Sequence, residues 1–380
     1  MAAAAVFDVA VLGAGPAGCS AAIMLASAGH RVGLLAPASP PRPLARCGAV
    51  RIGDSLAPEA APVLRRLGVW TAFKADGHLP CHSNRSVWGS DRPHQLDFIH
   101  HPQGHGYHID RECFDRRLLE RAVELGAALV PLTAPLAVVR AGERWQLMAG
   151  AVNIDAARVV DASGRAAWFA RRQGAQRCDH GPQVALVAWL QGHGGRADDG
   201  ASLIEAVADG WWYSAPLPGG RWSTAFFTDA DLHDHRALRT EHGWRAALAA
   251  APLTSERLAV DSPRWRGRPS FVPADSGRLD HPCGAGWVAV GDAAISYDPL
   301  SAHGLTVALA SGVDAGDALH RELAGDLAAT DGYARRLRGA FEAYAAMRLR
   351  LYCSETRFTD QPYWARRQAP SRAPPAMAVQ

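Results

Sequence analysis

The sequence predicts an α/β protein in which a domain with a parallel sheet is interleaved with a smaller domain built on a mostly antiparallel sheet. Residues 6–12 form a largely apolar run, as expected of a strand buried inside a parallel sheet. A glycine-rich turn, a helix at 21–28 and a second strand at 31–35 follow this run. Strand-like runs separated by polar loops fill the segment from 184 to about 273. A long helix predicted at 333–355 begins a C-terminal segment.

The motifs described below also divide the chain into parts. Residues 1–80, 106–180 and 275–335 are predicted to form a cofactor-binding domain, 81–105 and 181–274 a substrate domain, 336–367 a C-terminal helical segment, and 368–380 a disordered tail. Further predicted elements are helices at 58–73, 111–125 and 241–250 and strands at 151–160, 184–190, 211–215 and 222–227.

The composition is that of an ordinary globular protein large enough to bury a sizeable core. The 380 residues are 48% hydrophobic and carry a formal charge of +3, a balance that gives no reason to expect a nucleic-acid partner. The seven cysteines include no CxxC pair, so we expect reduced thiols in a cytoplasmic protein. Residues 1–5 lack the basic residues of a signal peptide, and no apolar run is long enough to cross a bilayer, so no membrane association is expected.

The glycine-rich turn is the first motif with a chemical meaning, and it reads Gly13, Ala14, Gly15, Pro16, Ala17 and Gly18. Between a strand and a helix this pattern predicts a dinucleotide site: Gly13 permits the tight turn, Gly15 lets the backbone approach a pyrophosphate, and Gly18 lets the helix pack on the strand. A glycine-rich turn without a ligand is the alternative. The acidic residue expected near the end of the second strand, for the adenosine ribose, is Ala36 here. Either Arg46 and backbone groups hold that ribose, or the adenosine binds more loosely than usual.

A second motif lies in the stretch 288–309. A short apolar strand ends in a tight turn at Gly291 and Asp292, which can hold one acidic side chain against a ligand hydroxyl. Pro299 stands where a helix is expected to begin, and residues 304–309 read as its continuation. A helix start presents unpaired N–H groups and partial positive charge, so it suits a ligand group that becomes anionic.

This second motif carries a resemblance to a known family. Segments 291–294 and 298–304 resemble the second FAD motif of the p-hydroxybenzoate hydroxylase superfamily, in the branch of the flavin-dependent tryptophan halogenases and the flavoprotein maturases of tryptophylquinone enzymes. Other phrases similar to this superfamily or branch stand at 51–56, 110–119, 161–165, 209–218 and 357–367. The resemblance covers nearly the whole chain. It implies a Rossmann-type FAD-binding domain, glutathione-reductase-like and of the p-hydroxybenzoate hydroxylase type, with the antiparallel substrate domain as a roof over the flavin.

The resemblance implies one FAD per chain, bound without a covalent link. The residues that it and the two motifs assign to the cofactor are Gly13, Ala14, Gly15, Pro16, Ala17, Gly18, Arg46, Arg111, Asp161, Gly291, Asp292, Pro299, Ser301, His303, Gly304 and Leu305. Arg111 is carried over as a contact of the ribityl–pyrophosphate region, with an exposed arginine in the first helical turn as the alternative. Segment 51–56 is implied to lie beside the flavin, or else provides a plain helix N-cap at Asp54 or Ser55.

Three residues are predicted to act near the reacting end of the flavin, namely His303, Trp212 and Ser301. His303 either donates a hydrogen bond there or fills space. Trp211 and Trp212 are neighbours on a strand and point to opposite faces, so one of them is expected to face the cavity, although paired aromatics on a strand more often belong to the core. The histidine-rich stretch 100–108 reads as a substrate-facing loop rather than a metal site, because no Cys or carboxylate has ligand spacing with it.

The function implied by the resemblance is that of an FAD-dependent monooxygenase. In that superfamily reduced flavin and O2 give a C4a-hydroperoxide that hydroxylates an electron-rich aromatic ring, while NAD(P)H or a reduced-flavin source visits only transiently. The maturase-like phrases make a tryptophan within a partner polypeptide the expected substrate. Two alternatives stay open. One is a flavin-dependent halogenase, for which the only lysine, Lys74, stands at the wrong place in the sequence. The other is a non-enzymatic flavin-binding partner protein.

Overall fold

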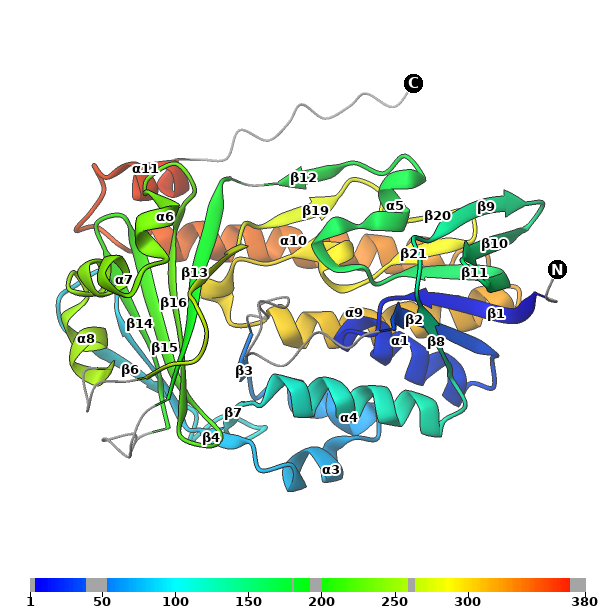
Figure 1. Cartoon of the computed structure of the whole chain (residues 1–380), viewed down its shortest axis with the longest axis horizontal. Helices are drawn as coiled ribbons and strands as arrows, with labels where there is room; N and C mark the ends of the chain where they lie inside the picture. The colour runs from blue at the N-terminus through cyan, green and yellow to red at the C-terminus, as the bar shows by residue number, and fades with distance from the viewer. Residues whose placement is uncertain (1–3, 39–52, 180, 192–199, 259–263, 370–380) are drawn as a thin grey trace.

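The protein, seen in Figure 1 as a computed structural model, is an elongated molecule with a sheet at each end. The structure describes residues 4–38, 53–179, 181–191, 200–258 and 264–369. The long helix α10 (Ala329–Cys353) runs between the two ends and so connects the parts that carry the two sheets.

The sheet at one end is mainly parallel and forms the centre of the cofactor-binding domain. Its strands, in spatial order, are β20 (Cys283–Gly284), β21 (Trp287–Ala289), β11 (Val152–Asp161), β1 (Ala5–Leu12), β2 (Val32–Pro37) and β8 (Ala128–Leu132), with β10 (Arg144–Ala149) and β9 (Ala137–Ala141) added as a hairpin on β11. β1 pairs in parallel with β2 and β11, and β11 pairs in parallel with β21. The carboxyl ends of β1, β11 and β21 therefore meet at one edge of the sheet, where the loops that follow them come together.

Helices α1 (Pro16–Ser27) and α9 (Gly304–Leu323) pack tightly because glycines stand at their contact. A Cβ at Gly312 would collide with the carbonyl oxygen of Ala17, and a Cβ at Gly316 would lie 2.6 Å from the Cβ of Met24. Later residues of α9 meet later residues of α1, so the two helices run parallel. Gly312 lies against Ala17 in the first turn of α1, and α9 begins eight residues earlier, at Gly304. The start of α9 therefore extends about 12 Å past the start of α1.

The sheet at the other end belongs to the substrate domain and is mostly antiparallel. Its strands, in spatial order, are β17 (Arg264–Trp265), β13 (Gln183–Gln191), β16 (Arg221–Asp229), β15 (Gly210–Leu217), β14 (Ser202–Val207), β5 (Ser83–Val87) and β6 (His94–Asp97), with β18 (Ser270–Pro273) on β13. One face is covered by α6 (His235–Leu238), α7 (Glu241–Leu248) and α8 (Pro252–Leu258). The opposite face packs against the C-terminal end of α10 and α11 (Pro362–Gln368). β14 was not predicted from the sequence.

Shorter elements complete the fold. They are α2 (Ala60–Arg66), α3 (Trp70–Ala75), α4 (Arg111–Glu124), α5 (Trp168–Arg172), the three-stranded sheet of β3 (Ser55–Leu56), β7 (Gly106–His108) and β4 (Leu79–Cys81), the sheet of β12 (Arg177–Asp179), β19 (Gly277–Leu279) and β22 (Ile295–Ser296), and the 3₁₀ turns η1 (Gly164–Ala166), η2 (Gly291–Ala293) and η3 (Pro299–Ser301).

The fold confirms the predicted α/β class, with antiparallel sheets and C-terminal helices, but two predicted helices were wrong in detail. The helix expected at 58–73 is two helices, because Gly68 has a φ of +70° and separates α2 from α3. The helix expected to begin at Pro299 begins at Gly304. Pro299 instead opens the single turn η3, and Ala302, with a φ of +53°, ends it. The division of the chain into numbered domain segments stays a prediction.

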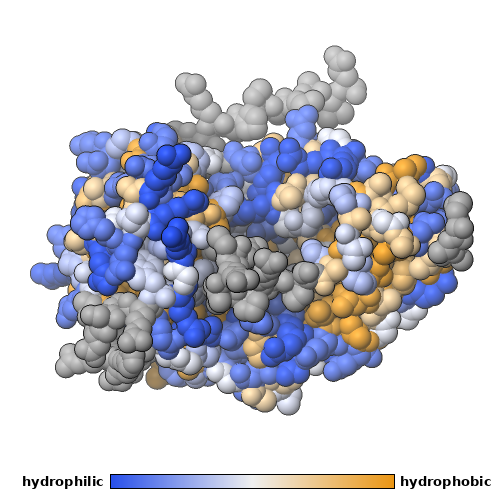
Figure 2. Space-filling model, in the orientation of Figure 1, coloured by the Kyte–Doolittle hydropathy of each residue, from blue (hydrophilic) through white to orange (hydrophobic). Residues whose placement is uncertain are grey.

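Figure 2 shows that the two ends differ in surface character. Apolar surface gathers over the end that carries β1, β2 and β8, while the end with the antiparallel sheet is largely hydrophilic. Exposed apolar side chains of the parallel-sheet domain include Val6, Leu129 and Val139. None of the helices in the described ranges combines the length and the apolar character that a membrane crossing requires.

Candidate functional site

The glycine turn after β1 leaves room for a ligand at one position only. A Cβ at Gly13 would collide with the carbonyl oxygen of Ala162, and one at Gly18 with the carbonyl oxygen of Gly13. A Cβ at Gly15, by contrast, would meet no heavy atom within 4 Å. Ala14 lies between these glycines in the same turn, partly exposed.

Gly15 is also the N-cap of α1, and no side chain caps this helix. Pro16 occupies the first helical position, where its missing N–H costs nothing, and Ala17 follows it. The unpaired N–H groups of the first turn therefore face the open space in front of Gly15, as an anionic pyrophosphate would require.

The turn after β21 lies against this same helix start. Gly291 has a φ of +56°, and a Cβ on it would lie 2.7 Å from the Cβ of Ala17. Its N–H donates to Ser311 Oγ at 2.9 Å, which ties the turn to α9. Glycine is thus required here both for the backbone angle and for the close approach. The two motifs predicted from the sequence are brought together by this contact.

Asp292 lies close to arginines. Its side chain is 44% exposed, yet the surrounding protein raises the pKa of its carboxyl group, and the charges of Arg165, Arg177 and Arg111 oppose this shift. Arg165 Nε lies 3.7 Å from Asp292 Oδ2, and Arg177 Nη1 donates to the Asp292 carbonyl oxygen at 3.0 Å. Asp292 therefore presents an accessible carboxylate beside these arginines. A ligand hydroxyl could take this place.

The start of α9 is the second open helix end. A Cβ at Gly304 would meet no atom within 4 Å, and no side chain caps the helix. Leu305 turns its side chain into the core, so only its backbone can serve a ligand. Thr306, in the first turn, has a buried hydroxyl with no hydrogen-bond partner among the described residues. Sequence reasoning missed Thr306, because a threonine in the first turn of a helix is unremarkable by itself.

Ser301 and His303 shape the turn in front of this helix. The Ser301 hydroxyl donates to the Asp298 carbonyl oxygen at 3.0 Å, and the His303 ring contacts the Ser301 carbonyl oxygen through Nδ1. Pro299 begins the same turn. These bonds are local to the turn, so they fix where His303 stands. Direct catalytic roles for Ser301 and His303 stay predictions.

Asp161 does not have the free side chain that a cofactor contact requires. It is fully buried, and its two carboxylate oxygens accept hydrogen bonds from the N–H and hydroxyl groups of Ser163 and from the N–H groups of Phe169 and Ala170, at 2.6–3.0 Å. The carboxylate holds the loop after β11 and caps the start of α5. The carboxylate thus serves its own loop, and the assignment of Asp161 to the cofactor stays a prediction.

Trp212 lies on the wrong face of the antiparallel sheet for a catalytic role. It is 0% exposed, stacks on Phe226 with ring centroids 4.9 Å apart, and meets Trp244 of α7 edge-on. Trp211 points to the opposite face, toward α10 and α11, but stacks there on Phe227 and is also buried. Neither indole faces an open cavity, so this prediction was wrong: both rings are core residues of the sheet, which is the commoner use of paired aromatics.

Asp54 lies where the cofactor domain meets the antiparallel sheet. It is 6% exposed and accepts a hydrogen bond of 2.6 Å from Ser223 Oγ on β16. Burial raises the pKa of Asp54, while the Ser223 bond and the charge of Arg111 oppose this. The alternative of a plain N-cap was wrong, because α2 begins at Ala60.

Arg111 connects Asp54 with Asp292, since its charge acts on the carboxyl groups of both. Its guanidinium donates to the Gly53 carbonyl oxygen at 3.2 Å and lies 3.4 Å from Asp115 Oδ1. The side chain is 15% exposed, so the alternative of an exposed arginine was wrong. Its position at the first turn of α4 follows from the Asp110 N-cap, whose carboxylate accepts from two backbone N–H groups of that turn.

A second polar chain joins the same two parts. Tyr213 Oη on β15 lies 2.6 Å from Ser55 Oγ on β3, and Ser55 Oγ lies 2.9 Å from His108 Nδ1 on β7. Burial raises the pKa of Tyr213 well above its ordinary value, so the phenol stays protonated. The histidine at the end of the 100–108 stretch is therefore buried in the structure rather than exposed on a rim. In the described part of the chain no group of three or more His, Cys, Asp or Glu residues could hold a metal ion.

Two residues named in the sequence analysis, Arg46 and Lys74, have not yet been placed. Arg46 falls in 39–52, outside the described residues. Lys74 is exposed on α3, with its ammonium 5.7 Å from the ring centroid of Trp70.

The residues present fit an FAD molecule. The open space at Gly15 suits its pyrophosphate, the accessible carboxylate of Asp292 suits a ribityl hydroxyl, and the uncapped start of α9 at Gly304 suits the edge of the flavin ring that becomes anionic. The separation of about 12 Å between the two helix starts leaves room for the ribityl chain between them.

Comparison with known proteins agrees with this fit. Residues 6–162 match the family model described as an FAD binding domain. The chain is 26% identical to the FAD-dependent oxidoreductase LodB of Marinomonas mediterranea over 370 residues, 96% of this chain and 97% of that protein. The solved structure of the myxobacterial chondrochloren halogenase CndH has a TM-score of 0.83 at 24% identity, over 96% of this chain and 86% of that one, which shows a shared fold.

A third similar structure is that of QhpG, a peptidyl tryptophan dihydroxylase essential for tryptophylquinone cofactor biogenesis. It has a TM-score of 0.74 at 25% identity, over 97% of this chain and 80% of that one. Both the open helix ends and these likenesses, which extend along almost all of the chain, point to one assignment. The chain is an FAD-dependent oxidoreductase that is similar, along almost all of its length, to monooxygenases and halogenases that use FAD.

Proposed function

We propose that this enzyme is an FAD-dependent monooxygenase that hydroxylates a tryptophan ring held in a larger molecule, such as a partner polypeptide. The observation that carries the proposal is the position of Lys74. It is the only lysine of the chain, and it is exposed on the outer side of α3 beside Trp70. The flavin-dependent tryptophan halogenases that this sequence resembles use a lysine in the substrate cavity, and this chain has none to offer there.

The likeness to the peptidyl tryptophan dihydroxylase supports the choice of substrate class. It extends over 97% of this chain, so it includes the substrate domain as well as the FAD-binding domain. A hydroxylation needs no halide relay, so the absence of a second lysine is compatible with it.

The chain's own residues would divide the work as follows. The start of α1 at Gly15 holds the pyrophosphate, Asp292 holds a ribityl hydroxyl, and the start of α9 places partial positive charge at the flavin ring. When bound, FAD supplies the redox chemistry with O2, and an NAD(P)H or reduced-flavin source supplies the electrons. The buried polar contacts of Asp54 and Tyr213 hold the antiparallel sheet at a fixed position over the flavin. This orients the aromatic ring and keeps water away.

A larger substrate would also supply part of the enclosure. The loop between β6 and β7 carries Ile99, which is 82% exposed, and β6 carries Leu96, which is 59% exposed. β6 is the last strand of the antiparallel sheet, and all four of its residues are exposed. A free amino acid would leave this rim open to solvent, whereas a bound polypeptide can cover it.

The test compares substrates of different size on the FAD-loaded enzyme. Free L-tryptophan should stimulate NAD(P)H oxidation poorly, with most of the oxygen recovered as hydrogen peroxide. A tryptophan-containing polypeptide encoded beside this gene, co-expressed with the enzyme, should gain one or two oxygen atoms by intact mass. Tight coupling with free tryptophan would overturn the large substrate and leave the monooxygenase standing. A halide-dependent product without oxygen gain would instead establish the halogenase.

A further inference from the structure

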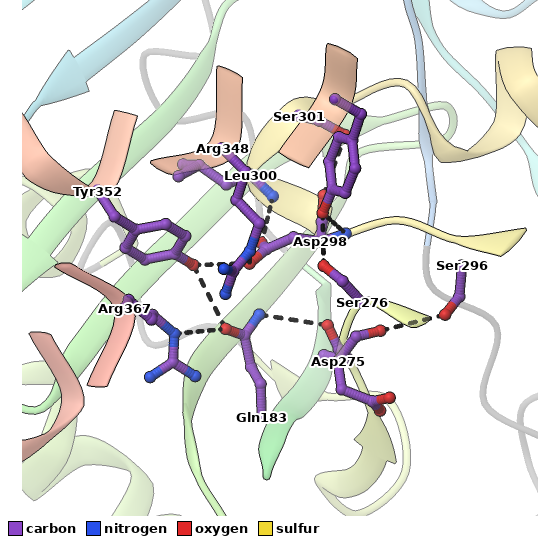
Figure 3. A network of polar contacts seen from close by, with 12 residues as sticks. Gln183, Asp275, Ser276, Ser296, Asp298, Leu300, Ser301, Arg348, Tyr352 and Arg367 are labelled. Atoms are coloured by element: carbon purple, nitrogen blue, oxygen red, sulfur yellow. Dashed lines mark hydrogen bonds and ion pairs between the residues drawn. The ribbon is translucent and has the colours of Figure 1, made fainter. Parts of the chain in front are cut away.

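A buried carboxylate lies behind the turn that precedes α9. Asp298 is 1% exposed and accepts three hydrogen bonds: Leu300 N–H at 3.0 Å on Oδ1, and Tyr352 Oη at 2.8 Å and Arg348 Nε at 3.0 Å on Oδ2 (Figure 3). Arg348 and Tyr352 stand one turn apart on α10. The guanidinium of Arg348 lies 4.7 Å from the centroid of the Tyr352 ring, so both donors are themselves held in place.

The backbone of Asp298 is held as firmly as its side chain. Its N–H donates to Tyr344 Oη at 2.6 Å, and Tyr344 Oη in turn contacts Ser276 Oγ. Its carbonyl oxygen accepts from the hydroxyl of Ser301. Every polar group of this residue is therefore used, and each bond leads to the turn or to a rigid helix.

The same network reaches the antiparallel sheet. Tyr352 Oη lies 3.3 Å from Gln183 Oε1 on β13, and Arg367 Nε of α11 donates to that oxygen at 3.0 Å (Figure 3). Arg367 also forms a buried ion pair with Asp229 on β16 at 2.5 Å. The C-terminal helices α10 and α11 thus connect the turn at Asp298 with two central strands of the substrate domain.

The position of this network matters more than its net stability. A buried ion pair gains little over apolar packing, because desolvation offsets the attraction, but the directions of its hydrogen bonds fix geometry. Here the geometry that is fixed belongs to the residues immediately before α9. The uncapped start of that helix is one of the two open helix ends of the cofactor site.

We propose that Asp298 is a positioning residue for the flavin. Through Leu300 and Ser301 it sets the place of the α9 start against the flavin ring, and Arg348 and Tyr352 hold Asp298 itself. No contact between Asp298 and the cofactor is needed, because the carboxylate acts from behind the turn. The C-terminal helices are then part of the cofactor site as well as of the fold.

The test is Asp298→Asn in the full chain, read out on the flavin rather than on turnover. The amide oxygen can replace only one of the two carboxylate oxygens, so the NH2 group must face either the Leu300 N–H or the donors Arg348 and Tyr352. The turn should therefore shift and move the helix start away from the ring. FAD affinity of the apoprotein should fall about tenfold, as expected for the loss of one strong hydrogen bond. The flavin midpoint potential should become more negative, because the partial positive charge that favours the anionic reduced ring is displaced.

Glu205→Gln is the matched control. Glu205 is also a buried carboxylate, but it accepts from the backbone of Leu253 and Thr254 on the far side of the antiparallel sheet. This variant should lower the unfolding temperature and leave the flavin potential at the wild-type value. An Asp298→Asn protein with wild-type potential and FAD affinity, or an equal shift in the control, would overturn the proposal.

Tyr352→Phe covers the case in which Asp298→Asn does not fold. It removes one donor to Asp298 and keeps the ring in its packing place between Trp88 and Trp364. A smaller shift of the potential in the same direction supports the positioning role, and an unchanged potential contradicts it.

Discussion

The hydroxyl oxygens of Tyr213 and Ser55 lie 2.6 Å apart, and this contact joins the antiparallel sheet to the FAD-binding domain. Beside it, the Asp54 carboxylate accepts from Ser223 at 2.6 Å, so two successive residues of one segment contact two adjacent strands. The segment of Asp54 and Ser55, which the family resemblance implies to lie beside the flavin, is thus fixed to the antiparallel sheet. The two domains meet through buried hydrogen bonds, which specify distance and orientation more strictly than apolar packing does.

The Tyr213–Ser55 contact should be measurable as a coupling energy. Tyr213→Phe and Ser55→Ala should each destabilise the protein, and a double-mutant cycle by urea unfolding should give about 0.5–1.5 kcal/mol of interaction. Tyr107→Phe is the control, because its ring packs on Phe73 and its hydroxyl makes no hydrogen bond among the described residues. A coupling energy near zero would show that the two hydroxyls do not interact in solution.

Gly15→Val should abolish FAD retention. The open space in front of Gly15 is where the pyrophosphate approaches the first turn of α1, and a branched side chain would fill it. Gly339→Val is the control, since Gly339 on α10 also faces open space but lies away from the site. The measurement is the ratio of flavin to protein absorbance after purification. Full flavin content in the Gly15 variant would contradict the assignment of the pyrophosphate site.

Asp292→Ala should weaken FAD binding strongly. The lost charge-assisted hydrogen bond to a ribityl hydroxyl corresponds to about 1.5–3 kcal/mol, or roughly 10- to 150-fold in the dissociation constant. Asp179→Asn serves as the control, because Asp179 pairs with the same Arg177 and is exposed to a similar extent, but stands on β12 outside the turn after β21. Titration of the apoprotein with FAD, followed by flavin fluorescence, gives both constants. Equal affinities for the Asp292 variant and wild type would place the ribityl chain elsewhere.

Asp54→Asn should change how stability depends on pH. Burial raises the folded-state pKa of Asp54 above the ordinary value of 3.8, so the stability that its neutral form provides is complete at low pH and is lost as pH rises through the folded-state pKa. Asparagine stays neutral. The free energy of unfolding of the variant, relative to wild type, should therefore increase between about pH 4 and pH 8.

Urea unfolding of both apoproteins across this range checks the Asp54 prediction. A difference between variant and wild type that stays constant with pH would mean that Asp54 titrates in the folded protein as it does in the unfolded chain. A difference that decreases with pH would mean that Arg111 and Ser223 outweigh burial.

Lys74→Ala should leave the activity close to that of wild type. Lys74 lies over the Trp70 ring on the outside of α3, and losing one exposed cation–π contact costs about 0.5–1 kcal/mol of stability. Arg65→Ala is a suitable comparison, because Arg65 lies over the same ring at 5.0 Å. The measurement is product formation from the co-expressed polypeptide. Complete loss of turnover in Lys74→Ala alone, with a halide-dependent product in wild type, would favour the halogenase.

The amino-acid sequence alone predicted the fold class and the turns at which glycine is required. Gly13, Gly18 and Gly291 could be assigned in advance, because their places depend on backbone angles and close approach that only glycine provides. These constraints are local, so they are visible in a short stretch of chain.

Side-chain roles were decided by the tertiary structure. Asp161 stands in a turn that resembles a cofactor motif, but four bonds within its own loop use both of its oxygens. Either Trp211 or Trp212 was expected to face the cavity, but Trp212 is buried between the sheet and α7. Strand periodicity gives two faces and does not say which one the other domain will cover.

Only the assembled fold revealed Asp298, Arg348 and Tyr352 as one unit. Fifty residues separate Asp298 from Arg348 in the sequence, and no spacing rule joins them. Their contact exists because α10 passes behind the turn before α9, and this path depends on the packing of the whole core. Long-range pairing of this kind follows from tertiary packing, which a pattern in one stretch of the chain does not contain.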